Sequence, residues 1–496
     1  MERRPPGRRA VIVGHVVGLE ANAPNGGSLA DAGPPPYVRA ATYPGAFMPR
    51  DEEANRLSAR ASRYARLGVE AGAFAARVGA SRLTGAGRDD DARVFAEALG
   101  SMKGPVMKVA QLLATIPDAL PADYSEQLMK LQSQAPPMGA AFVKRRMQAE
   151  LGPGWRERFG EFSLEPAAAA SLGQVHRATT LEGEPVACKL QYPDMASAVE
   201  ADLSQLNMLF AIRRRMGAAI DTREVQIEIG DRLREELDYS REIKLAALYR
   251  HMLADTPEVR VPRPHPELSS KRLLTLQWLD GEKLLAFEKA APRTRSRVAE
   301  LLFKAWWRPF LRYGVIHGDP HLGNYSVVTG AEVEAVNLYD FGCVRIFPMR
   351  FVEGVSELYQ ALKTKDRERI VHAYDLWGFK GLKKTTIEAM NIWASFIYGP
   401  ILDNRVRSFA DGVKPSEFGR KEIRAVMQAL RSEGTQLTAP REFVFLDRAA
   451  IGLGAAFLRL GAELNFHRLY EETIADFSTE TVGARQQEAL KAAGLA

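Results

Sequence analysis

The sequence has 496 residues, enough for roughly two or three compact units. Its hydrophobic content of 46% and charged content of 26% are typical of a soluble globular protein. The net charge of +6 is modest and spread along the chain, which favours attraction to an anionic membrane surface over a dedicated nucleic-acid groove. The only two cysteines, Cys188 and Cys343, exclude a disulfide framework and indicate a reducing compartment.

Membrane insertion and secretion are both disfavoured by the sequence. No apolar run reaches the roughly 18 to 20 residues that a spanning helix requires. The N-terminal arginines, the following apolar stretch and Ala21-Asn22-Ala23 imitate a secretory signal, but Glu2, two prolines and His15 interrupt that pattern. We therefore expect a cytoplasmic protein without a transmembrane helix, with a peripheral position on the inner face of the membrane as the alternative.

The first third of the chain is expected to precede the main folded unit. Residues 1–50 are rich in Gly, Pro and Ala and lack periodicity, which predicts a flexible tail. From Asp51 the pattern becomes helical, and we expect a helical extension over residues 51–150. Within it, Lys108 and Gln111 stand three positions apart, so on a helix they share one face.

The remaining chain divides into a strand-containing part and a helical part. Short apolar segments over residues 151–285 predict a small sheet, with a hairpin at Gly183-Glu184-Pro185 and a buried strand over 273–279. Residues 286–480 are expected to be mainly helical, apart from two polar segments. Residues 481–496 are expected to form a tail.

These two polar segments carry the strongest functional signal. Residues 317–324 read H-x-D-x-x-x-x-N, and a D-F-G triplet begins 16 residues after Asn324, at Asp340. Phosphoryl transfer needs an Asp that orients the attacking hydroxyl, an Asn that holds a metal, and a second Asp that holds metal against the nucleotide phosphates. We expect Asp319 in the first role and Asn324 and Asp340 as metal ligands. D-F-G alone recurs by chance, but the two motifs at this spacing are specific.

A phosphate-binding loop is predicted upstream. Residues 168–175 occupy the frame G-x-G-x-x-G-x-V, but alanine stands at the first two glycine positions. A Cβ there limits positive φ and the approach of the backbone to a ligand, so we expect a stiffer loop than in an ordinary kinase. The alternative is a helix start, because alanine is the best helix former. The residues expected to bind nucleotide are Ala168, Ala169, Ala170, Ser171, Gly173, Val175 and Lys189.

Lys189 ends the sequence V-A-C-K, close to the V-A-I-K strand whose lysine holds the α- and β-phosphates. Such a lysine needs a carboxylate partner, and the acidic segment 235–242 offers several. On one continuous helix, Asp238 and Glu242 would share a face, whereas Glu236 would point about 120° away from Glu242. We expect Glu242 to pair with Lys189; the alternative is a solvated acidic turn.

Together these residues resemble the UbiB/AarF family of atypical protein-kinase-like proteins, over residues 95–475. The shared motifs are a K-x-G-Q helix, the loop A-A-A-S, V-A-x-K, E-x-D followed by a helix Glu, H-x-D-P-H-x-G-N and D-F-G. The resemblance implies an α+β fold, bilobal and protein-kinase-like, with a mostly helical N-terminal extension over the peptide-substrate cleft. It also implies that Lys108 and Gln111 reach the active site and that Lys108 pairs with Glu236. Ala110 departs from the glycine of the family motif.

The resemblance further implies an ATP-dependent phosphotransferase or ATPase that binds ATP or ADP with Mg²⁺. Its partners would be nucleotide and a lipid or quinone intermediate rather than nucleic acid, and its role would lie in ubiquinone or related lipid metabolism. The catalytic residues implied are Lys108, Gln111, Lys189, Glu236, Asp238, Glu242 and Asp319.

Two alternatives remain: a small-molecule phosphotransferase of the aminoglycoside or choline kinase type, which shares the H-G-D form, and a nucleotide-binding pseudokinase scaffold. Gly318 stands where regulated protein kinases carry Arg, and no A-P-E motif follows D-F-G. Both features argue against a conventional protein kinase.

Overall fold

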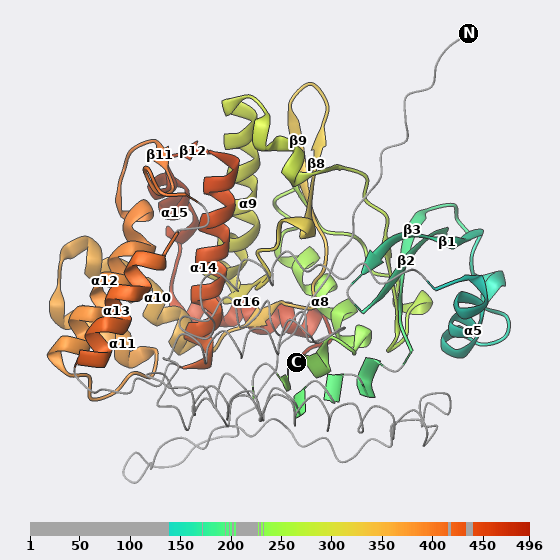
Figure 1. The fold of residues 1–496 in the computed structure, drawn as a ribbon, viewed down its shortest axis with the longest axis horizontal. Helices are drawn as coiled ribbons and strands as arrows, with labels where there is room; N and C mark the ends of the chain where they lie inside the picture. The colour runs from blue at the N-terminus through green and yellow to red at the C-terminus, as the bar shows by residue number, and fades with distance from the viewer. Residues whose placement is uncertain are drawn as a thin grey trace, which may run out of the picture.

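The computed structural model describes residues 138–496, except Ser171, much of 194–232, 415–417 and 433–439. Figure 1 shows a strand-rich part built from β1–β3 and α5 at one end and a helical part at the other, with α8, β8 and β9 between them. Lys108, Gln111 and Ser171 lie outside the described residues.

The strand-rich lobe is an antiparallel sheet in the order β1-β2-β3-β5. The β2–β3 turn contains Gly183 at φ 85°, which confirms the predicted hairpin. On one face, α5 (Ala140–Leu151) and the 3-10 turn Trp155–Arg158 pack through Phe142, Val143 and Trp155. The strands are β1 (Glu161–Ala170), β2 (Gly173–Thr179), β3 (Pro185–Gln191) and β5 (Leu273–Gln277).

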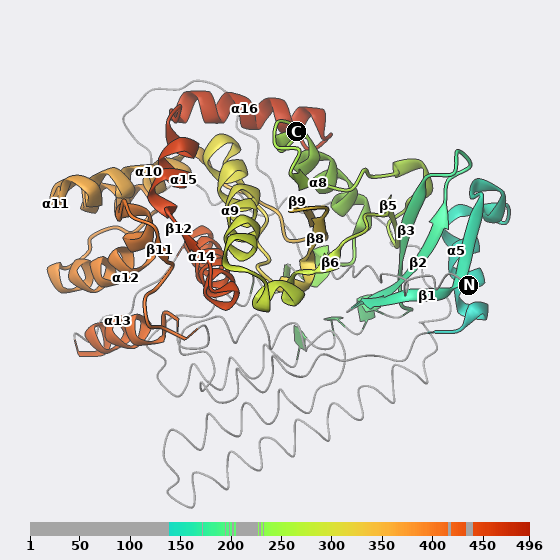
Figure 2. The same ribbon diagram turned by 90° about the horizontal axis from the view of Figure 1, so that it is seen from above.

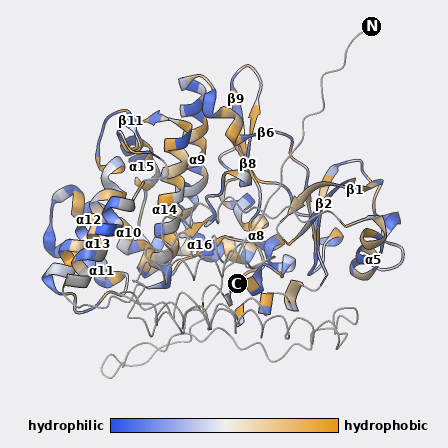
Figure 3. Ribbon diagram, in the orientation of Figure 1, coloured by the Kyte–Doolittle hydropathy of each residue, from blue (hydrophilic) through white to orange (hydrophobic). Residues whose placement is uncertain are grey.

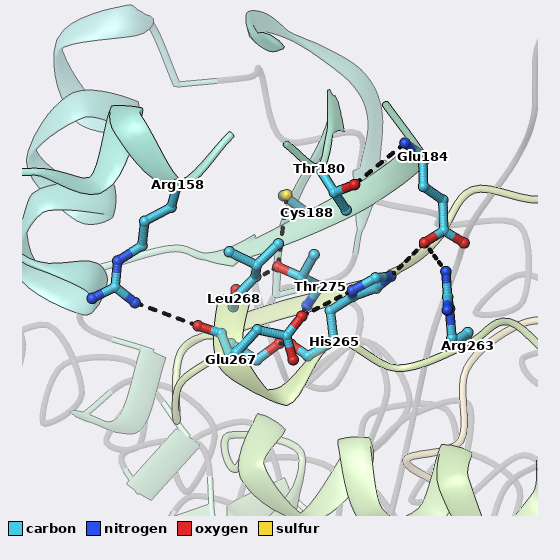
Figure 4. A network of polar contacts seen from close by, with 10 residues as sticks. Arg158, Thr180, Glu184, Cys188, Arg263, His265, Glu267, Leu268 and Thr275 are labelled. Carbon is cyan, nitrogen blue, oxygen red and sulfur yellow. Dashed lines mark hydrogen bonds and ion pairs between the residues drawn. The ribbon is translucent and has the colours of Figure 1, made fainter. Parts of the chain in front are cut away.

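A polar network fastens the segment before β5 to this sheet (Figure 4). The ring of His265 lies between Glu184 Oε2, 3.3 Å from Nε2, and Glu267 Oε1, 3.0 Å from Nδ1. Thr275 Oγ1 donates to Leu268 O at 2.6 Å and lies 3.7 Å from Cys188 Sγ. Burial raises the pKa of the Cys188 thiol to about 12, so this cysteine is an inert packing residue.

Between the lobes, two small sheets bring the polar segments together. The first has the order β4-β9-β8-β6, and in the second β7 pairs with β10. Residues 317–324 connect β7 to β8, and Asp340 lies between β9 and β10, so both polar segments emerge at neighbouring strand ends. The strands are β4 (Val259–Arg260), β6 (Glu282–Lys283), β7 (Val315–Ile316), β8 (Tyr325–Thr329), β9 (Val333–Leu338) and β10 (Arg345–Ile346).

The helical lobe packs around α9, whose Trp306 and Phe310 are fully buried. Figure 2 shows α14 beside α9, with α16 lying across their ends, and Figure 3 shows apolar residues along α9 and β8–β9. The helices are α8 (Tyr239–Met252), α9 (Pro292–Tyr313), α10 (Met349–Thr364), α11 (Arg367–Leu376), α12 (Lys384–Leu402), α13 (Arg420–Ser432), α14 (Arg441–Leu460), α15 (Phe466–Ile474) and α16 (Thr479–Ala492). A short ribbon, β11 (Arg407–Ser408) with β12 (Glu463–Leu464), joins this lobe.

The C-terminal segment differs from the expected tail. Residues 481–496 include most of α16, and Gln486 on this helix donates to Tyr313 O at 2.9 Å and to Phe347 O at 3.1 Å. These bonds fasten α16 to the end of α9. Among the described residues, every helix is too short or too polar to cross a membrane.

Candidate active site

The loop between β7 and β8 holds Asp319 and Asn324 in direct contact. Asn324 Nδ2 donates to Asp319 Oδ2 at 3.0 Å, and Tyr325 OH donates to the Asp319 carbonyl at 3.1 Å. Gly318 precedes them at φ 78°, and a Cβ there would lie 2.2 Å from Cys343 O. Only glycine therefore fits at position 318, because the chain after D-F-G packs directly on this loop.

Asp340 adopts a left-handed backbone conformation, with φ 58°. Such a conformation costs a non-glycine residue about 1–3 kcal/mol and is concentrated at functional sites. Its Oδ1 accepts a hydrogen bond from Gly342 N at 3.0 Å, and its Oδ2 lies 3.5 Å from Lys189 Nζ. The turn therefore directs the carboxylate toward the strand-rich lobe.

Lys189 is the centre of a buried charge cluster. Its Nζ lies 3.3 Å from Glu242 Oε2 and 3.4 Å from Oε1, in addition to its contact with Asp340. The ammonium also lies 4.9 Å from the centre of the Tyr239 ring, a cation–π distance. The structure thus brings together three predicted residues and adds Tyr239, which the sequence analysis did not select although it follows Asp238 directly.

Burial and the neighbouring charges set the protonation of this cluster. Burial by itself would lower the pKa of Lys189, but Glu242 and Asp340 outweigh it and raise the pKa above its ordinary value. Burial raises the pKa of Glu242 to about 7. The charge of Lys189 lowers this pKa and the charge of Asp340 raises it, but burial is the largest effect. Lys189 is therefore the charged member, and Glu242 is the member that can take up a proton.

The alanines of the predicted phosphate loop are strand residues. Ala168 pairs with Val175, Ala169 with Gln174 and Ala170 with Gly173, so β1 and β2 form a tight hairpin. They form neither an open loop nor a helix start. A Cβ on Gly173 would lie 2.1 Å from Leu190 O, so glycine is required here by the close approach of β3.

A small apolar cluster lies next to this hairpin. Its buried members are Val175, Ala187 and Tyr339, and three partly buried residues pack on them, namely Ala168, Trp278 and Leu279. These side chains come from the hairpin, from the strand of Lys189, from the connection after β5 and from the position before D-F-G. The sequence analysis selected only Ala168 and Val175 among them; the others adjoin its motifs but are ordinary apolar residues in isolation.

The expected single helix from Glu235 to Glu242 is broken. Glu236 and Leu237 form a turn, and α8 begins at Tyr239, so the predicted angle of about 120° between Glu236 and Glu242 does not apply. Glu236 is buried, and it lines the same small cavity as Glu242. This correction places the two carboxylates on one side of the site.

Asp238 has a local structural role. Its side chain accepts a hydrogen bond from Ser240 N at 3.1 Å and so caps α8, and its Oδ2 lies 3.8 Å from Lys271 Nζ. The side chain is 38% exposed. We therefore assign Asp238 to helix capping, which aligns Glu242 in the first turn of α8.

The donor set fits a small divalent cation such as Mg²⁺. Asn324 Oδ1 is buried and has no hydrogen-bond partner within the part of the chain that the structure describes. The carboxylates of Asp319 and Asp340 lie at the same strand ends. The described residues contain no cluster of three or more His, Cys, Asp or Glu side chains that could by itself hold a metal. Mg²⁺ typically uses one or two carboxylates together with phosphate oxygens and water.

Comparisons with known proteins indicate the family to which the chain is related. Residues 130–374 match the ABC1 atypical kinase-like domain. The Saccharomyces cerevisiae protein named atypical kinase COQ8, mitochondrial, is 25% identical over 376 residues, which cover 75% of this chain and 74% of the relative. The Arabidopsis thaliana protein ACTIVITY OF BC1 COMPLEX KINASE 8, chloroplastic, is 31% identical over 281 residues, 54% of this chain and 36% of the relative.

The chain belongs to the UbiB/AarF family of atypical kinase-like proteins. A solved structure also resembles it, that of the Mycobacterium tuberculosis protein Rv3197 in complex with erythromycin. It has a TM-score of 0.52 and 26% identity, and the match covers 76% of this chain and 93% of that one. The predicted bilobal kinase-like fold of this UbiB/AarF protein is confirmed.

Proposed function

We propose that this UbiB/AarF protein is an atypical kinase or ATPase that binds ATP or ADP with Mg²⁺ in the site described above. The observation that carries the proposal is the buried Lys189 ammonium between Glu242 and Asp340. A lysine held in this way is presented to the phosphates of a nucleotide, and its carboxylate partner keeps it oriented. The apolar cluster of Val175, Ala187 and Tyr339 would receive the base.

Each polar residue then has a distinct task. Asn324 and Asp340 would hold Mg²⁺, which neutralises charge on the phosphates. Asp319, which accepts from Asn324 Nδ2, would orient the acceptor hydroxyl or water and take its proton. Lys108 and Gln111, which lie outside the described residues, are proposed to complete the site from the N-terminal extension, as the family resemblance implies.

We also propose that the activity serves ubiquinone or related lipid metabolism, at an anionic membrane surface. Support comes from the family resemblance, from the yeast relative that is named COQ8, and from the net charge of +6. Gly318 has no room for a side chain, so an Arg that reads a phosphorylated activation loop cannot stand there. This favours a small molecule or water as the acceptor over a peptide.

Asp340→Asn tests the nucleotide site. Asparagine tolerates the left-handed backbone at position 340, so the fold should persist while a metal-binding charge is lost. Mg·ATP at 100 times its dissociation constant should stabilise the wild type by about 2.7 kcal/mol in a thermal-shift titration. It should leave Asp340→Asn unshifted, whereas the surface control Asp375→Asn should behave like the wild type.

An equal shift in Asp340→Asn and wild type would contradict the metal assignment. Metal-dependent release of phosphate from ATP, measured on the same three proteins, separates an enzyme from a nucleotide-binding scaffold. Profiling of quinones and lipids in a deletion strain, complemented with wild type or Asp340→Asn, tests the metabolic role independently.

A further inference from the structure

The loop of Asp319, residues 317–324, is packed closely on both sides of this residue; we call it the catalytic loop. On one side, a Cβ on Gly318 would lie 2.2 Å from Cys343 O. On the other side, Pro320 packs on α14, where a Cβ on Gly452 would lie 2.1 Å from Pro320 Cγ and 2.6 Å from Pro320 Cβ. Each neighbour of Asp319 is therefore held by a close approach that requires glycine.

The contact with Pro320 is what requires glycine at position 452. Gly452 lies in the interior of α14, and its φ is not positive, so the backbone conformation would accept any residue. Glycine is a poor residue inside a helix, because it loses more conformational entropy on folding than alanine does. A weak helix former at this position is explained by the space that the catalytic loop occupies.

The same face of α14 also reaches the segment after D-F-G. Phe445 precedes Gly452 by seven positions, which is two turns of an α-helix. Cζ of Arg345 lies 4.4 Å from the centre of the Phe445 ring, a cation–π distance. Arg345 belongs to β10, which pairs with β7 directly before the catalytic loop. The helix thus contacts both polar segments of the site.

Hydrogen bonds to other helices hold α14 in place. Trp393 Nε1 on α12 donates to Asp447 Oδ1 in the first half of α14. Arg295 Nη1 on α9 donates to Leu460 O, at the C-terminal end of α14, at 3.0 Å. Because the helix is fastened on both sides of Gly452, crowding at that position should displace the catalytic loop rather than the helix.

We propose that Gly452 is a positioning residue for Asp319 and acts through Pro320, an inference that rests on the catalytic role proposed for Asp319 above. A side chain at position 452 would have to move Pro320 by about 1 Å to reach an ordinary van der Waals distance. A change of ring pucker cannot provide this space, because Pro320 Cβ is itself too close. Asp319 would move with its neighbour, and a misplacement of about 1 Å can lower turnover by about 100-fold.

Gly452→Ala tests this role, with Gly454→Ala as the matched control two positions away on α14. A Cβ on Gly454 would lie 2.6 Å from Phe418 Cε1 and 2.7 Å from Phe409 Cε1, so both variants crowd the helix and should melt below the wild type. Only Gly452→Ala should lower kcat for metal-dependent release of phosphate from ATP, by about 100-fold. Its affinity for Mg·ATP, measured by calorimetry, should stay close to that of the wild type, because the Lys189 cluster is not displaced.

Hydrogen exchange of the catalytic loop provides a measurement without nucleotide. The His321 amide donates to Asp319 Oδ1 at 3.3 Å, and the Asn324 amide donates to His321 O at 3.0 Å. A displaced loop weakens these bonds, so both amides should exchange faster in Gly452→Ala but not in Gly454→Ala. If Gly452→Ala does not fold, Pro320→Ala opens the same contact by removing Cγ, and it should also accelerate exchange and lower kcat.

An equal loss of kcat in the two glycine variants would overturn the inference, since Gly452 would then act only through the stability of α14. Exchange as in the wild type in both Gly452→Ala and Pro320→Ala would overturn it as well. A wild type without metal-dependent turnover would overturn the proposed function. The exchange measurement would then still decide whether Gly452 positions the catalytic loop.

Discussion

The buried charge cluster around Lys189 should make the stability of the protein depend on pH through Glu242. Burial holds the pKa of Glu242 at about 7 in the folded protein, against an ordinary value of 4.5. A carboxyl whose folded pKa is raised stabilises the native state fully below pH 4.5, and that contribution is lost as pH rises through 7. At 1.36 kcal/mol per pKa unit, the rise from 4.5 to about 7 corresponds to about 3 kcal/mol.

The physical cause is the burial of the Glu242 carboxylate, and the nearby charge of Asp340 adds to it. Lys189, whose Nζ lies 3.3 Å from Glu242 Oε2, opposes the rise in the Glu242 pKa but does not cancel it. A proton on Glu242 removes the buried charge. Glu242→Gln imitates the protonated form and keeps the shape of the side chain, so the variant should not share this pH dependence.

The assay is chemical denaturation of wild type and Glu242→Gln from pH 4.5 to 8. The free energy of unfolding of the wild type, relative to the variant, should fall by about 3 kcal/mol across this window. Glu357→Gln is a control, because Glu357 should change the free energy of unfolding with pH in the opposite direction. The hydrogen bond from Arg369 lowers the pKa of Glu357. Its contribution is present above pH 4.5 and lost as pH falls. A constant difference between wild type and Glu242→Gln would refute the reasoning.

Two further predictions concern the hairpin and the N-terminal extension. Ala168→Gly should loosen the β1–β2 hairpin and strengthen the binding of ATP relative to ADP, measured by calorimetry; an unmoved ratio would show that the hairpin does not contact the phosphates. Lys108→Ala and Glu236→Ala should each lower the free energy of unfolding, by about 3–5 kcal/mol if they form a buried pair, and the double variant should lose less than the sum. Strict additivity would count against a Lys108–Glu236 contact.

Local motifs made much of the central site predictable from the sequence. Asp319 and Asn324 are five residues apart on one loop, so their contact follows from short-range geometry. Lys189 and Glu242 are 53 residues apart, and their pairing was predicted from the chemical need of a buried lysine for a carboxylate. In each case a buried polar or charged side chain needs a partner of complementary chemistry, and few other positions of the chain offer one.

Other features depend on tertiary contacts that leave little trace in the sequence. Alanine is a strong helix former, yet residues 168–170 are extended because β2 supplies their backbone partners. The acidic segment appeared to be one helix, but Asp238 caps α8 and ends that continuity. Likewise α16 is stabilised by Gln486, whose acceptors belong to residues 139 and 173 positions away in the chain.

Gly318 illustrates how packing changes the meaning of a sequence feature. From the sequence, glycine in place of Arg indicates only that a regulatory contact is missing. In the structure, Cys343 O lies 2.2 Å from the place of a Cβ, so the segment after D-F-G occupies the space that any side chain would need. An activation loop that is ordered through an Arg at this position is therefore excluded by the fold itself.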